Sequence, residues 1–374
     1  MKILFSTSSL FPYRVNWLDE LGKYADVDVY YLMDSDAARN TQWCAQRPKN
    51  CTYTLQKSRR FPKLGLISRD FIKVLKAKAK EYDVIILDGY GFASQILNIL
   101  YLNRKKLTYF VNIDGMVPKE EHPLARWFKR KLISRFPYCL CGAFATNEIL
   151  AGYGVKPEQI INHPFTSLYA KDISTQTATT QEKIALRQKL GITEGKVVIS
   201  VGRFSYMNGY GKGYDVLMRS AAQMPADMGW YIVGGEPTEE FARLKEEMGL
   251  QNVHFVEFMN KDALNEYYRA SDVFVLMTVG DVWGLVINEA MAVGLPVITT
   301  DKCVAGLDLV KDFENGFLVA VGDDAALCDR LHRIFDDPAI IANMARNSLE
   351  KVSPYTIENM ARIHMDAFRE VLKG

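Results

Sequence analysis

The feature that most constrains this chain is a repeated pattern of a short apolar run, a turn and a long amphipathic segment. One series of these repeats fills each half of the chain. Strands that alternate with helices are typical of parallel sheets built from right-handed βαβ units. The expected strands of the first half are residues 2–6, 27–32, 84–87, 107–113 and 139–145. Those of the second half are residues 197–201, 230–233, 253–256, 273–277, 297–299 and 317–319.

Helices are expected between these strands. They cover residues 15–24, 69–82, 215–223, 239–248, 261–270, 285–293, 325–335 and, after the last strand, 355–372. The sequence therefore predicts an α/β protein with two Rossmann-like domains. Ligands of open α/β sheets bind beyond the carboxyl ends of the strands, so the chemistry is expected in the loops that follow strands.

A length of 374 residues suits two domains. The least patterned stretch, residues 172–182, is rich in Thr, Ser and Gln and is the expected interdomain linker. We expect domains over residues 1–171 and 183–350, followed by a terminal helical segment, residues 351–374.

The net charge of +2 argues against a dedicated polyanion binder, but it hides an asymmetry. Residues 1–170 carry 25 Lys and Arg against 15 Asp and Glu, whereas residues 171–374 carry 21 against 29. The first half is therefore basic and the second acidic, which predicts an anionic partner for the first half. No nucleic-acid-binding motif is visible, so nucleic acid is not an expected partner.

The sequence also favours a compartment. No signal peptide and no apolar run of 18 residues is visible, and the six cysteines are scattered. Cys139 and Cys141 have strand spacing and are expected to be buried thiols, and Cys44 belongs to no metal-ligand pattern. We expect a cytoplasmic protein without a structural metal.

Two segments concentrate the basic excess, residues 56–82 and residues 126–136, and the second interleaves cations with Trp127 and Phe128. Basic amphipathic helices with aromatic side chains bind anionic membranes, which would place the protein on the inner face of the membrane. The alternative is a solvated cationic face over an ordinary core stripe.

A loop with two cations follows the strand at residues 197–201. Arg203 comes directly after Gly202, and Lys212 follows nine residues later, across a Gly-rich stretch. A forked guanidinium and a point charge suit a diphosphate, although two ordinary cations in an exposed loop are the alternative.

Two carboxylates flank the start of the expected helix at residues 285–293. Asp281 lies in the loop before it and Glu289 lies within it, on a largely apolar segment where an acidic side chain needs a partner or a ligand. Gly284 opens the helix, whose first N–H groups favour an anion or a sugar hydroxyl. An N-capping Asp with a solvated Glu is the alternative. Gly234 ends another strand, where a plain turn is the simpler interpretation.

Taken together, these residues make the chain resemble the retaining GT-B glycosyltransferases of family 4, also called glycosyl transferases group 1. The residues that carry the resemblance are Gly202-Arg203, Lys212-Gly213, residues 233–237 (VGGEP), residues 281–296 (DVWGLVINEAMAVGLP), Ala305-Gly306 and residues 315–319 (NGFLV). They cover the second half closely, whereas the first half matches only in outline.

The resemblance implies a GT-B arrangement in which two Rossmann-like domains face each other across a cleft and the final segment returns to the N-terminal domain. It also implies that Arg203 and Lys212 hold the diphosphate of a nucleotide sugar, with Gly234 nearby. Glu289 would hold the ribose hydroxyls and Asp281 the sugar hydroxyls. The backbone amides of Gly284, Leu285 and Val286 would contact the sugar or the β-phosphate.

The implied chemistry uses the nucleotide diphosphate sugar as substrate, with no metal and no other cofactor, because fixed cations stabilise the leaving diphosphate. The sequence departs from the family in two places. Asp281 stands where Glu is usual, and the loop between Arg203 and Lys212 is about four residues longer than its common form.

The first half offers candidates for the acceptor side. Arg14 and Asn16 begin a helix after the first strand, where they would touch phosphate or acceptor, or merely be exposed. Asp114 follows the strand at residues 107–113, roughly where the family carries a His, and is the expected base, with a turn-forming Asp-Gly as the alternative. His122 is the second candidate base.

The sequence thus predicts a retaining glycosyltransferase that moves a sugar from a nucleotide diphosphate sugar to a saccharide acceptor, free or lipid-linked, in polysaccharide or glycoconjugate assembly. Two alternatives stay open: a sugar-nucleotide epimerase of the same architecture, and a non-catalytic nucleotide-sugar-binding protein. A dinucleotide-dependent oxidoreductase is disfavoured, because no G-x-G-x-x-G follows the first strand.

Overall fold

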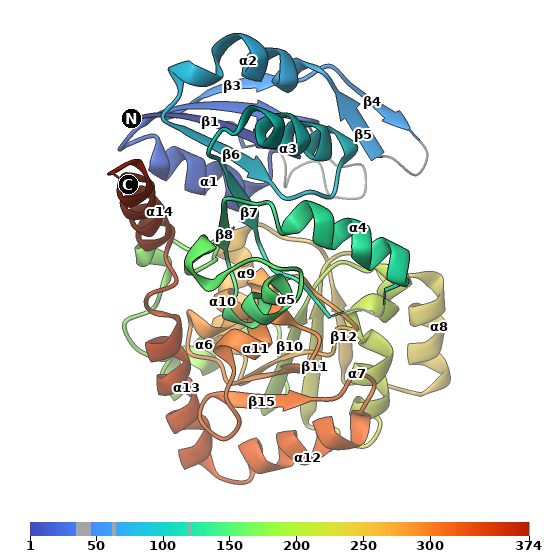
Figure 1. Ribbon diagram of the computed structural model, residues 1–374. Coiled ribbons are helices and arrows are strands. Elements are labelled where there is room, and N and C mark those ends of the chain that lie inside the picture. Colours follow the sequence, from blue (N-terminus) through green and yellow to red (C-terminus); the bar gives the residue numbers. More distant parts are fainter. Residues whose placement is uncertain (35–45, 62–64, 119–120, 374) are drawn as a thin grey trace. The chain divides into compact units, whose positions relative to one another are not determined.

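The computed structural model of the chain describes residues 1–34, 46–61, 65–118 and 121–373, so Cys44 lies outside the described residues. The chain forms two compact units (Figure 1). Unit 1 comprises Met1–Ser167 with Tyr355–Gly374, and unit 2 comprises Leu168–Pro354. Unit 1 ends at Ser167 rather than at residue 171, and unit 2 begins at Leu168 rather than at residue 183. Residues 172–182 therefore belong to unit 2 and are not a linker between the units.

Unit 1 is built on a parallel sheet with the strand order β3-β2-β1-β6-β7-β8-β9. Its strands are β1 (Lys2–Thr7), β2 (Asp26–Tyr31), β3 (Thr52–Leu55), β6 (Val84–Asp88), β7 (Phe110–Ile113), β8 (Tyr138–Cys141) and β9 (Ile160–Asn162). An antiparallel hairpin, β4 (Ser58–Phe61) with β5 (Gly65–Ser68), stands apart from this sheet.

Helices cover both faces of the sheet of unit 1. They are α1 (Pro12–Leu21), α2 (Asp70–Lys78), α3 (Ala93–Lys105), α4 (Pro123–Ile133), α5 (Asn147–Gly152) and α14 (Ile357–Lys373), with the short 3-10 turns Ala79–Glu81, Phe144–Thr146 and Pro157–Gln159. Alternate residues of β1 point to opposite faces. Leu4 packs in the core with α2 and α3, whereas Phe5 meets Trp17 of α1.

Unit 2 repeats this plan in a six-stranded parallel sheet with the order β12-β11-β10-β13-β14-β15. Its strands are β10 (Lys196–Val201), β11 (Met228–Val233), β12 (Val253–Val256), β13 (Val273–Leu276), β14 (Val297–Thr300) and β15 (Gly316–Val319). Its helices are α6 (Thr180–Leu190), α7 (Tyr214–Ala221), α8 (Glu239–Glu247), α9 (Lys261–Ala270), α10 (Leu285–Met291), α11 (Val304–Leu309), α12 (Asp324–Phe335) and α13 (Pro338–Val352), with 3-10 turns at Ala170–Asp172 and Met207–Lys212.

In both sheets the strand order reverses beside the first strand, between β1 and β6 in unit 1 and between β10 and β13 in unit 2. This is the doubly wound arrangement, and its reversal point is where the loops that follow two central strands part to make room for a ligand. The predicted α/β class with two Rossmann-like domains is therefore confirmed. Within the described ranges, no helix combines the length and the apolar character needed to span a bilayer.

Helix α14 packs against α1 within unit 1 (Figure 1). The indole N–H of Trp17 donates to Nδ1 of His364 at 3.1 Å, and Phe368 meets Phe110 with ring centroids 4.9 Å apart. The His364 ring lies 4.3 Å from that of His163, and both histidines are buried. Nε2 of His364 and both ring nitrogens of His163 have no hydrogen-bond partner within the described part of the chain.

Burial next to Arg14 lowers the pKa of His163 to about 3, and burial beside His163 likewise lowers the pKa of His364. The folded protein therefore keeps both rings neutral over a range in which the unfolded chain, with an ordinary pKa of 6.5, binds protons. The contribution of these two neutral histidines to the free energy of unfolding is therefore fully present above pH 6.5. It is lost as the pH falls from there toward 3.

We expect the free energy of unfolding of unit 1 to drop, below pH 6.5, by up to about 1.4 kcal/mol per pH unit for each of these histidines. Urea titrations on either side of pH 6.5 measure this slope. His163→Leu should flatten it, whereas His332→Leu, at an exposed position of α12, should not. An unchanged slope in His163→Leu would contradict the burial of a neutral ring.

Candidate functional site

The loops that follow β10, β11, β13 and β14 meet at the carboxyl edge of the sheet of unit 2. The hydroxyl of Thr278 donates to the carbonyl of Gly211 at 2.8 Å, which ties the loop after β13 to the loop after β10. The backbone N–H of Asp281 donates to the carbonyl of Lys302 at 3.0 Å, which ties it to the loop after β14. These contacts bring the loop that carries Lys212 next to the loop that carries Asp281.

The loop after β10 has an unusual backbone. Met207, Asn208 and Gly209 all have positive φ, at 48°, 52° and 93°. Left-handed backbone costs a non-glycine residue energy and is concentrated at functional sites. The turn leads into Lys212, so the extra length of this loop is folded into a compact 3-10 segment rather than left extended.

Lys212 and Asp281 form an ion pair. Nζ of Lys212 lies 2.7 Å from Oδ2 of Asp281, and the two side chains are 14% and 21% exposed. The ammonium also lies 5.5 Å from the centre of the Tyr206 ring, within the range of a cation–π contact. The residue predicted to bind the diphosphate, Lys212, therefore contacts the residue predicted to bind the sugar, Asp281.

Asp281 is held by the backbone around it. Its Oδ1 accepts from the N–H of Trp283 at 3.3 Å, and its carbonyl accepts from the N–H of Val304 at 3.1 Å. The residue that precedes α10 as its N-cap is Gly284, not Asp281. The alternative of an N-capping Asp is therefore wrong, and the carboxylate is oriented by its own loop instead.

Gly284 is required by two independent features. Its φ is +101°, and a Cβ built on it would lie 2.7 Å from Sγ of Cys303. Cys303 is buried and donates to the carbonyl of Trp283, and burial raises its pKa to about 12, so the thiol stays protonated and packs as an apolar group. Helix α10 then begins at Leu285, followed by Val286, with no side-chain cap.

Glu289 lies on α10, half-buried. Its Oε2 accepts from the hydroxyl of Tyr268 at 3.3 Å, and burial beside this carboxylate raises the pKa of Tyr268 well above its usual value. The alternative of a solvated Glu is therefore wrong. Arg203, also half-buried, starts the loop after β10. Gly234 follows β11 so close to Gly202 that a Cβ would lie 1.7 Å from the Gly202 carbonyl oxygen.

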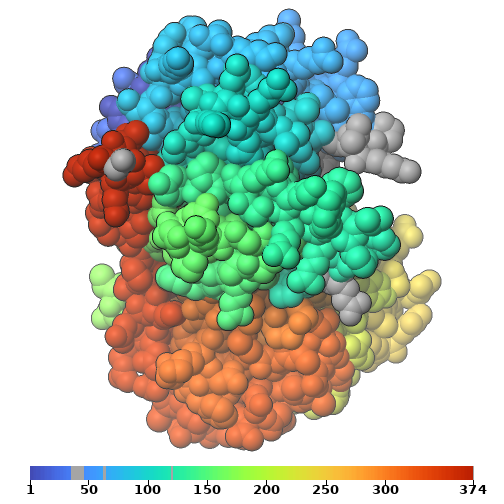
Figure 2. Space-filling view, viewed as in Figure 1, coloured from blue at the N-terminus to red at the C-terminus, as the bar shows by residue number. Residues whose placement is uncertain are grey.

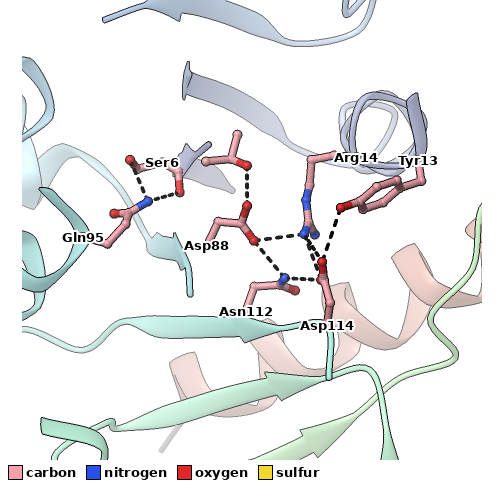
Figure 3. A network of polar contacts seen from close by, with 8 residues as sticks. Ser6, Tyr13, Arg14, Asp88, Gln95, Asn112 and Asp114 are labelled. Atoms are coloured by element: carbon pink, nitrogen blue, oxygen red, sulfur yellow. Dashed lines mark hydrogen bonds and ion pairs between the residues drawn. The ribbon is translucent and has the colours of Figure 1, made fainter. Parts of the chain in front are cut away.

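A second polar cluster lies at the carboxyl edge of the sheet of unit 1, beside its reversal point (Figure 3). The guanidinium of Arg14 is 3% exposed, and its Nη2 donates to Oδ1 of Asp88 at 2.9 Å and to Oδ1 and Oδ2 of Asp114 at 2.8 and 2.9 Å. Asn112 donates to both carboxylates, at 3.1 and 2.9 Å, and Thr7 donates to Asp88. The alternative of an exposed helix start is thus wrong for Arg14.

The charges of this cluster depend on one another. Burial alone would lower the pKa of Arg14, but Asp114 and Asp88 more than offset this and raise it. Burial, opposed by Arg14 and reinforced by Asp114, raises the pKa of Asp88. Asp114 is the more exposed carboxylate of the two, at 23% against 13%. Asp114 is therefore the carboxylate of this cluster that solvent reaches more easily, and the buried guanidinium of Arg14 holds it in place.

Asp88 was missed by the sequence analysis, although a carboxylate directly after the apolar run at residues 84–87 was a usable signal. The other two candidates of unit 1 lie apart from this network. The amide of Gln46 donates to Asn16 at 2.5 Å, and Nδ1 of His122 accepts from the N–H of Leu124 as the N-cap of α4.

The described residues contain no group of three or more His, Cys, Asp or Glu side chains placed to hold a metal ion.

Comparison with known proteins gives a family for unit 2. Residues 182–351 match the sequence model of the family described as glycosyl transferases group 1. The resemblance expected from the motifs is therefore confirmed.

Among curated relatives of this group 1 domain, a D-inositol 3-phosphate glycosyltransferase of a Nocardioides species is 29% identical over 211 residues. The match covers 50% of this chain and 45% of that protein. The chain thus spans about half the length of the curated relatives it matches.

Solved structures resemble the whole chain. A sucrose-phosphate synthase from Thermosynechococcus elongatus has a TM-score of 0.77 at 20% identity, covering 100% of this chain and 99% of its own. Anabaena HepE in complex with UDP has a TM-score of 0.77 at 21% identity, covering 99% and 100%. At such identities the likeness shows the fold alone, which is the predicted GT-B fold class with two Rossmann-like domains.

We expect Gly284→Ala to destabilise unit 2 by about 2–4 kcal/mol, because the new Cβ meets positive φ and a buried sulfur at once. Gly280→Ala is the matched control in the same loop, since a Cβ there meets no atom within 4 Å and φ is not positive. Thermal melts of both variants measure the difference. Equal melting temperatures would show that the turn before α10 is not as described.

Proposed function

We propose that this protein is a retaining glycosyltransferase that moves a sugar from a nucleotide diphosphate sugar to a saccharide acceptor, free or lipid-linked, in polysaccharide or glycoconjugate assembly. The observation that carries the proposal is the gathering of Arg203, the Lys212–Asp281 pair and Glu289 at one sheet edge of a group 1 domain. Two cations and two carboxylates there match a ligand with a diphosphate at its centre and hydroxyls at both ends.

On the donor side, Arg203 and Lys212 hold the diphosphate and stabilise the charge that develops on it as the sugar leaves. Glu289 accepts hydrogen bonds from the two ribose hydroxyls, and Asp281 accepts from a hydroxyl of the sugar. Side-chain cations take the place of a metal ion in this scheme. That solved neighbours of the same fold include complexes with UDP and UDP-glucose supports a nucleoside diphosphate as the common element.

On the acceptor side, Asp114 accepts the proton of the attacking hydroxyl. Arg14 is a positioning residue rather than a phosphate ligand, because its guanidinium is buried and bound to Asp88 and Asp114. Holding the carboxylate in one orientation lowers the entropic cost of the reaction.

We expect Arg203→Ala and Glu289→Ala each to reduce transfer by at least about 100-fold while leaving the protein folded, since each removes a group bound to the donor. Arg243→Ala and Glu247→Ala, at an exposed ion pair on α8, are the matched controls. Transfer is measured as release of the nucleoside diphosphate from UDP-, ADP- and GDP-sugars with candidate saccharides.

Wild-type rates in Arg203→Ala or Glu289→Ala would refute the site. An NMR time course with the donor alone separates an epimerase, which interconverts the nucleotide sugar without an acceptor, from a transferase. Tight donor binding with no turnover would favour a non-catalytic binding protein.

We also propose that α4 binds an anionic membrane surface and brings the enzyme to a lipid-linked acceptor. Its apolar side chains do not form a core stripe: Leu124, Trp127 and Phe128 are 63%, 49% and 64% exposed, and within the helix only Ile133 is buried. Arg126, Lys129, Arg130 and Lys131 lie among them. The segment that contains α4 lies on the molecular surface (Figure 2).

The exposure of these side chains supports membrane binding over a cationic face that covers an ordinary core stripe. Exposed aromatic rings beside cations combine apolar burial in the lipid boundary with attraction to anionic headgroups.

We expect the wild-type protein to float with vesicles that contain anionic lipid at low salt, and Trp127→Ser/Phe128→Ser to reduce the bound fraction at least about tenfold. The matched control is Leu97→Ser/Leu100→Ser on α3, which removes two side chains of similar exposure, 47% and 46%, from another helix. Absence of wild-type binding at low salt would refute membrane association.

A further inference from the structure

We propose that the Lys212–Asp281 ion pair is a sensor for the sugar of the donor, which makes the site prefer a nucleotide sugar over the bare nucleoside diphosphate. The inference rests on the proposed function and concerns an exchange of partners within it. In the structure Nζ of Lys212 pairs with Oδ2 of Asp281. A diphosphate competes with Asp281 for the ammonium of Lys212, and a sugar hydroxyl competes with Lys212 for Oδ2 of Asp281.

The two partners differ in freedom. Asp281 is anchored, because its backbone pairs with Lys302 and Val304 and its Oδ1 accepts from the N–H of Trp283. Lys212 carries its charge on a flexible four-carbon stem. When a diphosphate competes for the ammonium, it is therefore Lys212 that moves, and Oδ2 of Asp281 is the atom that loses its partner.

What happens next depends on the ligand. A nucleotide sugar offers a hydroxyl that donates to Oδ2, so the carboxylate exchanges one hydrogen bond for another. A nucleoside diphosphate offers no such donor, and the carboxylate is left beside like charge in a partly buried site. The anchored carboxylate thus opposes the binding of a nucleoside diphosphate and tolerates the nucleotide sugar.

The exchange of partners between Lys212 and Asp281 reverses once the sugar has been transferred. After transfer the sugar is gone, so Oδ2 loses its hydroxyl and attracts Lys212 again. The hold on the diphosphate weakens at that moment, and product release is favoured. Charge complementarity is used here for discrimination rather than for raw affinity.

The test compares the dissociation constants of UDP, ADP and GDP with those of UDP-glucose, ADP-glucose and GDP-glucose by calorimetry. In Asp281→Asn the like charge is gone, so the nucleoside diphosphate should bind about tenfold more tightly while its glucose conjugate gains nothing. Asp281→Ser is a second neutral variant that gives the same result if the amide perturbs folding, and Asp281→Glu should restore the wild-type preference.

Asp301→Asn is the matched control, because it removes an exposed carboxylate just after β14 that pairs with the adjacent Lys302. If wild type binds the probes but the preference is unchanged in both neutral variants, or changes equally in Asp301→Asn, the sensor is refuted and the proposed function stands. If wild type binds none of the six probes, the proposed function falls and the sensor with it.

Discussion

The reversal of strand order between β10 and β13 is the constraint on which the rest of the candidate site depends. Two neighbouring parallel strands end at the same edge, yet their chains turn away to opposite sides of the sheet, which leaves their loops side by side. One loop carries Arg203 and Lys212, and the other carries Asp281 and leads to Glu289. Lys212 and Asp281, which are 69 positions apart, are thus held in contact by sheet topology rather than by local sequence.

Close approach of backbone segments turns this topology into a rigid site. The Gly234 backbone touches that of Gly202, and Gly284 turns with positive φ over the sulfur of Cys303. A rigid frame keeps Asp281 in place while the flexible Lys212 changes partners. The corresponding sheet edge of unit 1 differs, because its cation is buried. The guanidinium of Arg14 binds the carboxylates of Asp88 and Asp114, so none of the three side chains moves freely.

The sequence predicted best where a pattern is local and strong. The apolar runs of the central strands identified β1, β6, β10, β11, β13 and β14 to within a few residues. It predicted worst where tertiary contacts override local character. The strand β3 and the hairpin of β4 and β5 were missed, since β3 and β4 are mostly exposed and show no apolar alternation. Helix α6 begins in the Thr-rich stretch taken as a linker, although Thr179 and Glu182 form a capping box that marked its start.

By itself the sequence determined the class of fold, the family motifs of the second half and the residue types of the candidate site, because periodicity and motif spacing are properties of short segments. Only the tertiary structure decided which of those residues contact one another. It paired Lys212 with Asp281, buried Arg14 between two carboxylates, and put the aromatic side chains of α4 on the surface. Ion pairing and burial depend on segments far apart in the chain. A local pattern can mark the apolar face of a helix, but it does not determine whether another segment covers that face.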